Sequence, residues 1–161
     1  MKSSRYLAII SMFLAALLFL GCHKNVVYDE NLKIPKEGWP VALPAYFDVN
    51  IEDSTSFYSM YLNIQNNDNY PNSNIYFFIT VVFPDGGMAR DTVNFLLADQ
   101  YGKWLGKGMG NEKTNQFLYR REMLFPFGGT YRFYIEQAMR ADTLKGITSI
   151  GIKLEKELQN Q

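Results

Sequence analysis

The chain has 161 residues, and its 16 basic and 16 acidic side chains leave no net charge at pH 7. This balance excludes the strongly basic surface on which nucleic-acid binding depends, so we expect no nucleic-acid partner. The single histidine, His23, lies beside the single cysteine, Cys22, and this excludes Ser-His-Asp triads, papain-like thiols and histidine-ligated zinc sites from the rest of the chain.

Residues 1–21 have the pattern of a lipoprotein signal peptide. A basic head with Lys2 and Arg5 precedes an apolar run over 6–20, which ends at Gly21-Cys22. The run matches the ~7–15 residues of a signal h-region and is shorter than a transmembrane helix of ~20; an uncleaved membrane anchor is the alternative. A lone cysteine at this junction is better explained by lipid attachment, palmitate included, than by a free thiol.

After the lipidated Cys22 we expect an extended lead-in to residue 44. Prolines at 35, 40 and 44 block a helix and favour an extended path. The Val-Val-Tyr run at 26–28 could add a short edge strand. We interpret Trp39 as a plug over one end of the core, because a tryptophan buries a large area when it can; an exposed partner contact is the alternative.

From residue 45 apolar and polar side chains alternate with the period of a β-strand, as in Phe47, Val49 and Ile51. The first two strands are predicted to pair as a hairpin, and a second hairpin is predicted to turn at 84–87. The sequence does not decide whether residues 136–145 form a helical turn or a loop. The expected strands span 45–51, 57–65, 75–83, 90–97, 117–125, 130–135 and 147–154.

This spacing predicts an all-β fold, an antiparallel β-sandwich of seven to eight strands over residues 45–156, followed by a frayed tail at 157–161. Jelly-roll and immunoglobulin-like topologies both remain open. The asparagine-rich segment 66–74 suggests a calcium loop, but Pro71 occupies the position where an EF-hand needs glycine, so we interpret it as a turn.

Gly106, Gly108 and Gly110, together with Lys103 and Lys107, suggest a phosphate cradle. Their spacing fits neither the dinucleotide fingerprint nor the P-loop, so we expect a structural loop with positive φ angles. A glycosidase-type pair of carboxylates remains arithmetically open, but no spacing singles out two of the candidates, which are Asp48, Asp91, Asp99, Glu122 and Glu136. We therefore expect no enzyme, no cofactor and no metal site.

Three segments stand out as specific: residues 58–67, the Gly-Lys-Trp-Leu-Gly-Lys-Gly run that begins at Gly102, and the Ile-Glu-Gln-Ala-Met-Arg run that begins at Ile135. Together they resemble the gliding-motility lipoprotein H (GldH) family. The resemblance implies an accessory envelope lipoprotein of the machinery that gliding bacteria use for surface movement and for the secretion linked to it. The family supplies no catalytic residues.

The first hypothesis is therefore a non-catalytic scaffold, anchored in the outer membrane by its N-terminal lipid, facing the periplasm and binding other envelope proteins of the motility or secretion apparatus. Tryptophan and arginine dominate interface hot spots, so the candidate partner surface comprises Lys103, Trp104, Lys107, Arg132, Glu136 and Arg140. The second hypothesis is a glycan-binding envelope lipoprotein, in which exposed aromatic rings stack on sugars.

Overall fold

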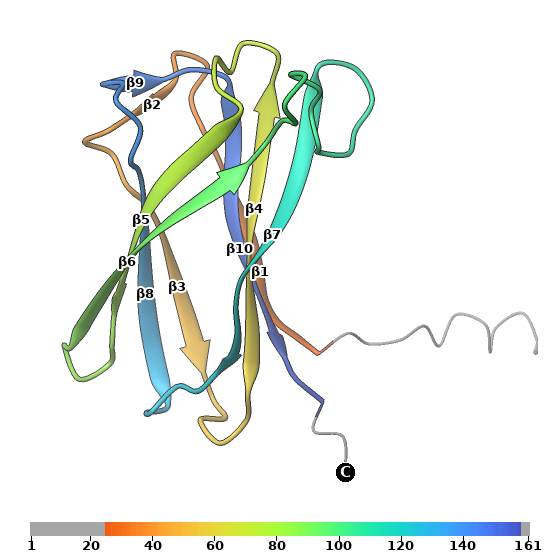
Figure 1. Cartoon of the computed structure of the whole chain (residues 1–161). Helices are drawn as coiled ribbons and strands as arrows, with labels where there is room; N and C mark the ends of the chain where they lie inside the picture. Colours follow the sequence, from red (N-terminus) through yellow and green to blue (C-terminus); the bar gives the residue numbers. More distant parts are fainter. Residues whose placement is uncertain (1–24, 159–161) are drawn as a thin grey trace, which may run out of the picture.

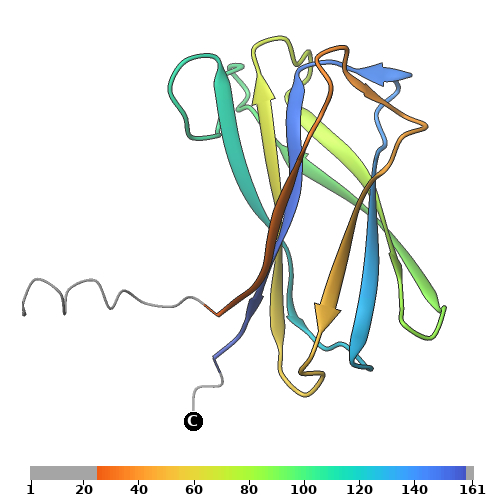
Figure 2. The same cartoon turned by 180° about the vertical axis from the view of Figure 1, so that it is seen from behind.

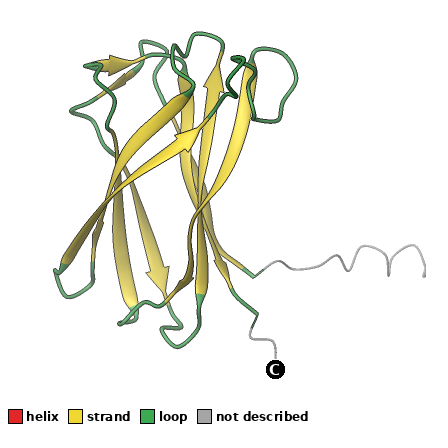
Figure 3. Ribbon diagram, in the orientation of Figure 1, coloured by secondary structure: helices red, strands yellow, loops and turns green. Residues whose placement is uncertain are grey.

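The computed structural model describes residues 25–158, and every regular element in this part of the chain is a strand (Figure 3). None of these residues forms a helix long and apolar enough to cross a membrane. The strands are β1 (Val26–Lys33), β2 (Trp39–Pro40), β3 (Ala45–Ile51), β4 (Tyr58–Asn67), β5 (Asn74–Val82), β6 (Met88–Leu96), β7 (Glu112–Met123), β8 (Gly129–Gln137), β9 (Thr143–Leu144) and β10 (Ile147–Lys156).

The eight long strands form two four-stranded antiparallel sheets that pack face to face (Figure 1). One sheet has the order β1-β10-β4-β7 and the other has the order β3-β8-β5-β6, while β2 and β9 pair as a small ribbon at one end. The all-β sandwich predicted from the alternating pattern is therefore confirmed.

The strand order also decides between the two topologies that the sequence left open. Among the eight long strands, the first sheet joins the first, eighth, third and sixth, and the second sheet joins the second, seventh, fourth and fifth. This interleaving of early and late strands in both sheets is the jelly-roll arrangement.

One of the two predicted hairpins is correct. Strands β5 and β6 pair directly, and Phe83 N donates to Gly87 O at 2.8 Å across their turn. The hairpin predicted for the first two strands of the domain is wrong, because β3 pairs with β8 whereas β4 pairs with β10 and β7. The segment 52–57 carries the chain from one sheet to the other. Alternation identifies the buried face of a strand but not its partner.

Two connecting segments contain more strand than the sequence suggested. The predicted lead-in begins as the eight-residue edge strand β1, which pairs with β10 from Val26 opposite Glu155 to Lys33 opposite Ser149. Near the C-terminal end, β8 continues to Gln137, and residues 138–146 form a loop that includes β9. Of the two interpretations offered for 136–145, the helical turn is wrong.

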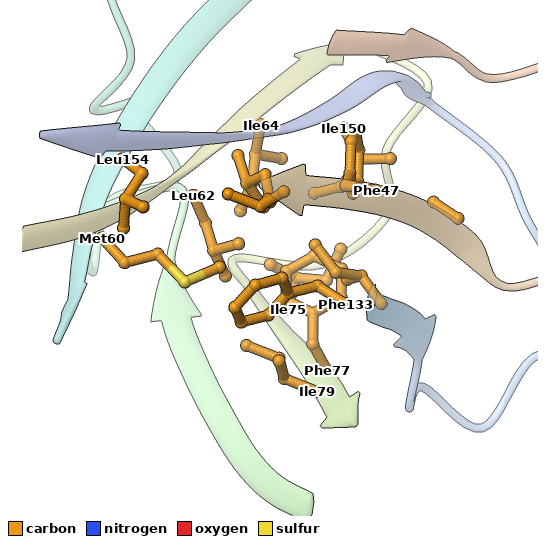
Figure 4. Packing of buried hydrophobic residues seen from close by; sticks show 14 of the residues in the cluster. Phe47, Met60, Leu62, Ile64, Ile75, Phe77, Ile79, Phe133, Ile150 and Leu154 are labelled. Carbon is orange, nitrogen blue, oxygen red and sulfur yellow. The ribbon is translucent and has the colours of Figure 1, made fainter. Parts of the chain in front are cut away.

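The core lies between the two sheets, where their inward side chains interlock (Figure 4). Phe47 and Phe133 from one sheet face Leu62 and Ile150 from the other, and each is at most 2% exposed. Trp39 closes one end of this core, with 1% of its surface exposed and its Nε1 donating to Leu43 O at 2.7 Å. The interpretation of Trp39 as a plug is confirmed.

The strand registers define two ends of the sandwich. At the N-terminal end, Lys156 N donates to Asn25 O, and the same end carries the segments 52–57, 83–87 and 124–128. At the opposite end, which we call the distal end, lie the segments 34–44, 67–73, 97–111 and 138–146. Both views of the molecule show this separation (Figures 1 and 2).

Candidate partner surface at the distal end

The glycine-rich segment 98–111 is an ordered loop. Its first half is closed by Asp99, whose Oδ1 accepts hydrogen bonds from the backbone N of Tyr101 at 2.8 Å and of Lys103 at 3.0 Å. Gly102 N donates to Asp99 O at 3.0 Å, and Ala98 forms an isolated bridge with Trp104. A side chain that bonds to backbone two and four residues ahead is typical of an Asx-type turn.

The second half of the loop is fixed from β7. Lys107 bridges to Thr114, and Lys113 Nζ donates to the carbonyl oxygens of Gly108 at 3.1 Å and Gly110 at 2.7 Å. Positive φ angles occur at Gly102, Gly108 and Gly110, a conformation that glycine adopts at little cost. The predicted positive φ angles are therefore confirmed at Gly108 and Gly110, but not at Gly106.

Trp104 holds this loop against the neighbouring asparagine-rich loop. The indole is half-buried, its Nε1 donates to Asp68 Oδ1 at 2.9 Å, and its ring lies 6.4 Å from that of Tyr70. Burial raises the pKa of Tyr70 to about 12, because the phenolate would lose its hydration. Trp104 therefore positions the loop, instead of projecting from it as a free contact.

The asparagine-rich loop itself is a turn, as predicted. Asn67 accepts two hydrogen bonds, from Asn69 N to Oδ1 and from Tyr70 N to the backbone O, both at 3.0 Å. Within residues 25–158 no three histidine, cysteine, aspartate or glutamate side chains gather where they could hold a metal ion.

The most exposed apolar side chains of the glycine loop were not singled out from the sequence. Tyr101 is 85% exposed, Met109 is 98% exposed and Leu105 is 55% exposed. Their signal was present, since each is a large apolar residue among glycines and lysines in a segment without strand alternation. Lys103 and Lys107 are exposed in the same loop.

Two hollows flank the ridge formed by Pro71 and Asn72. One hollow, of about 480 Å³, lies between this ridge and the glycine loop and includes Trp104 in its wall. The other, of about 740 Å³, lies on the far side of the ridge and is lined by Met139 and Arg140. The structure thus brings Trp104 and Arg140, from distant parts of the chain, to the two sides of one ridge.

Arg132 and Glu136 lie elsewhere, on the outer face of β8. Arg132 binds Asp48 through two parallel hydrogen bonds of 2.6 and 2.7 Å, and these bonds hold the pKa of the Asp48 carboxyl below its usual value. Glu136 forms an ion pair of 3.0 Å with Arg90 on β6. Arg132 therefore joins β8 to its neighbour β3, and Glu136 reaches across β5 to β6. Of Arg132, Glu136 and Arg140, only Arg140 lies at the distal end.

Eight aromatic side chains of the described residues are buried in the core. They are Trp39, Phe47, Tyr58, Tyr70, Phe77, Phe125, Tyr131 and Phe133. The expected lipid-attachment residue Cys22 and the predicted signal peptide 1–21 lie outside the described residues.

Comparisons with known proteins agree with one another. The model of the GldH lipoprotein family matches residues 26–154. The protein named gliding motility lipoprotein GldH homolog from Christiangramia forsetii is 34% identical over 147 residues, which cover 87% of this chain and 90% of that protein. Gliding motility lipoprotein GldH from Flavobacterium johnsoniae is 30% identical over 153 residues, covering 91% of this chain and 94% of the relative.

Among solved structures, dimeric latent PorU from Porphyromonas gingivalis aligns with 86% of this chain and 14% of its own at 11% identity. Its TM-score is 0.35, which is too low to carry an argument. The match to the family model and the two relatives covers nearly the whole sandwich. The chain therefore belongs to the GldH lipoprotein family, whose named relatives are lipoproteins of gliding motility.

Proposed function

We propose that this protein is a non-catalytic, lipid-anchored accessory component of the gliding-motility machinery and of the secretion linked to it, and that it binds other envelope proteins through its distal end. Membership of the family supports the motility setting. The single observation that carries the partner surface is the glycine loop, an ordered segment that holds Tyr101 and Met109 almost fully in solvent.

The energetics of this loop favour a contact role. Large apolar side chains held in water mark interaction sites when they cluster, and ordering them in advance lowers the entropy that a partner must remove on binding. The hydrogen bonds that Asp99 accepts from Tyr101 N and that Lys113 donates to Gly110 O fix the loop backbone beside these side chains. Tyrosine in particular offers a large contact area with few rotatable bonds.

The position of the loop fits a tethered protein. Strands β4 and β10 have ten residues each, so they separate the two ends by roughly 33 Å at about 3.3 Å per residue. The lipid at Cys22 would attach close to the N-terminal end. The glycine loop would then face away from the membrane, toward partners in the periplasm.

The test replaces the exposed side chains in a gliding host. The double variant Tyr101→Ser with Met109→Ser is expected to slow or abolish gliding while the protein level and the unfolding midpoint stay unchanged. Leu118→Ser is the matched control, because Leu118 is an exposed apolar residue on the outer face of β7, away from both ends. Normal gliding in the double variant would contradict the proposed partner surface.

The anchor is tested separately. Cys22→Ser is expected to abolish incorporation of labelled palmitate and to release the protein from the membrane fraction. If the protein is anchored in the outer membrane and faces the periplasm, the wild-type protein should sediment with the outer membrane and resist protease added to intact cells. Digestion in intact cells would instead place it on the cell surface.

The second hypothesis, glycan binding, finds one supporting feature. A hollow of about 490 Å³ on the outer face of the β1-β10-β4-β7 sheet is lined by amide and hydroxyl side chains, including Asn31, Asn63 and Gln116. The described residues that line it include no aromatic ring on which a sugar could stack. Calorimetry of the purified protein with envelope polysaccharides decides this alternative, and no heat of binding would end it.

A further inference from the structure

A second exposed apolar group lies at the N-terminal end, in the loop 124–128 between β7 and β8. Its sequence is Leu-Phe-Pro-Phe-Gly. Leu124 is 55% exposed and Phe127 is 47% exposed, whereas Phe125 between them is buried. The loop therefore anchors itself in the core through one aromatic ring and turns its other two large apolar side chains outward.

The contacts of this loop make it rigid. The ring of Phe125 packs edge-on against Tyr58 at 5.3 Å and against Tyr131 at 4.8 Å. The hydroxyl of Tyr131 donates to Phe127 O at 2.8 Å and accepts from Phe127 N at 3.1 Å. One buried tyrosine thus satisfies both backbone groups of the exposed residue, so the projection of Phe127 is built into the fold.

Two further apolar side chains are exposed at this end of the sandwich. Phe57 and Leu158 are exposed at the same end, where Glu157 N donates to Phe57 O at 2.8 Å. Two nearby acidic groups have partners within the domain: Asp53 is paired with Lys156 at 2.6 Å, and Glu157 accepts from Glu122 N at 3.1 Å. Among the described residues, the exposed carboxylates of Glu52 and Glu122 at this end form no ion pair, so the apolar side chains have to outweigh their charge at a membrane.

The length of chain before β1 determines what this end can meet. Three residues separate Cys22 from Val26, so four Cα–Cα steps span at most about 14 Å at ~3.6 Å each. Asn25 is bonded to Lys156 at the N-terminal end. A lipid on Cys22 would hold the bilayer surface within that short reach of the start of β1, which lies at the same end of the sandwich as the loop 124–128.

We propose that the loop 124–128, together with Phe57 and Leu158, inserts into the interfacial region of the same phospholipid membrane that receives the lipid at Cys22. This inference rests on the proposed lipid anchor. Exposed phenylalanine and leucine side chains bind at the headgroup–acyl boundary, about 5–10 Å deep in the case of interfacial helices. Two attachment points, one covalent and one through Phe127, hold the sandwich upright and direct the glycine loop away from the membrane.

The test uses the full-length mature protein, purified with its lipid and reconstituted in vesicles of phosphatidylethanolamine and phosphatidylglycerol. A thioether at Cys22 blocks the only native thiol, so a spin label reacts with a single introduced cysteine. In Phe127→Cys the label is expected to be several-fold more accessible to oxygen, relative to a water-soluble nickel chelate, than in Leu118→Cys or Leu105→Cys. Leu124→Cys is the second probe of the same loop.

The proposal would be overturned if the labels at 127 and 124 were as accessible to the chelate as the label at 118. The proposal would also be overturned if the labels were exposed to water in vesicles and shielded only in native envelopes, because a protein would then cover this end. Mass spectrometry of the peptide that contains Cys22 separates this failure from failure of the anchor. An unmodified peptide refutes the anchor, whereas a lipidated peptide with aqueous labels refutes only the loop insertion.

Discussion

Asp53 shows how a single residue fixes the crossing from β3 to β4. Its carboxylate accepts hydrogen bonds from Thr55 N at 2.9 Å, Thr55 Oγ1 at 2.7 Å and Ser56 Oγ at 2.7 Å, and it pairs with Lys156 Nζ at 2.6 Å. The hydrogen bond to Lys156 is the main cause that holds the pKa of Asp53 far below its usual value. The same carboxylate thereby ties the crossing segment to the last strand.

This arrangement predicts a defined pH dependence. Because the pKa of Asp53 is lower in the folded state than its ordinary value of about 3.9, its stabilising effect is complete above that value and is lost as the pH falls toward the folded-state pKa. Asp53→Asn should therefore lower the urea midpoint at pH 7 and lower it less at pH 3, where the carboxyl begins to take up a proton in the unfolded state but stays ionised in the folded one. An equal difference at both pH values would contradict the role of the charge.

Trp104 makes a second prediction at the residue scale. Trp104→Phe removes the hydrogen bond to Asp68 but keeps most of the ring packing against Tyr70, so it should cost about 1 kcal/mol of unfolding free energy and leave gliding intact. Trp104→Ala removes both contacts and should impair gliding at a normal protein level. If Trp104→Phe were as harmful to gliding as Trp104→Ala, the indole itself would be a partner contact.

At the scale of the elements, strand alternation was readable from the sequence where a strand has one face in the core and the other in water, as in β3 and β8. Strand β5 differs, because Phe77 is fully buried whereas the equally apolar Phe78 lies on the outer face under the Arg90 guanidinium, 4.5 Å from its ring centre. A stretch that is apolar on both faces reads from sequence as a buried central strand, and only the structure separates its two faces.

The two phenylalanines give a direct comparison. Phe77→Ala should lower the free energy of unfolding by about 3 to 5 kcal/mol, because it leaves a cavity between the sheets. Phe78→Ala should cost about 1 kcal/mol or less, as expected for a residue outside the core. Equilibrium unfolding in urea measures both values, and equal losses would contradict the orientation of β5.

Strand pairing was much less predictable than the strands themselves. The β3–β4 hairpin was inferred from proximity in sequence, yet a jelly roll sends these consecutive strands to different sheets. Strand β1 was expected to be shorter because its side chains are mostly exposed and show no buried face. The close approach of β1 to β10 requires Gly151, because a Cβ added there would overlap the side chain of Asn31 and the carbonyl oxygen of Glu30. Such long-range close contacts leave no local pattern.

The candidate site was predictable only in part, for the same reason. The glycine run indicated the loop 98–111, but nothing in it indicated that the indole of Trp104 binds Asp68 of the neighbouring loop. Arg132 and Glu136 were grouped with Arg140 by their spacing along β8. Their partners Asp48 and Arg90 come from β3 and β6, and no property of the β8 sequence identifies those neighbours.

On the scale of the whole molecule, the sandwich keeps its two apolar ends apart. The N-terminal end carries Phe127 close to the expected lipid, and the distal end carries Tyr101 and Met109 on a loop held by its own hydrogen bonds. The paired sheets between them form a spacer with a continuous core. In the proposed arrangement, one end contacts the membrane and the other end contacts a partner protein.

Site-specific photo-crosslinking in intact cells of a gliding host tests the central claim most directly. A photoreactive phenylalanine analogue in place of Tyr101 should give a discrete adduct with another envelope protein, and the same analogue in place of Leu118 should give none. If position 101 gave no adduct while the cells glided normally, or if position 118 gave the same adduct, the distal end would not be the partner surface.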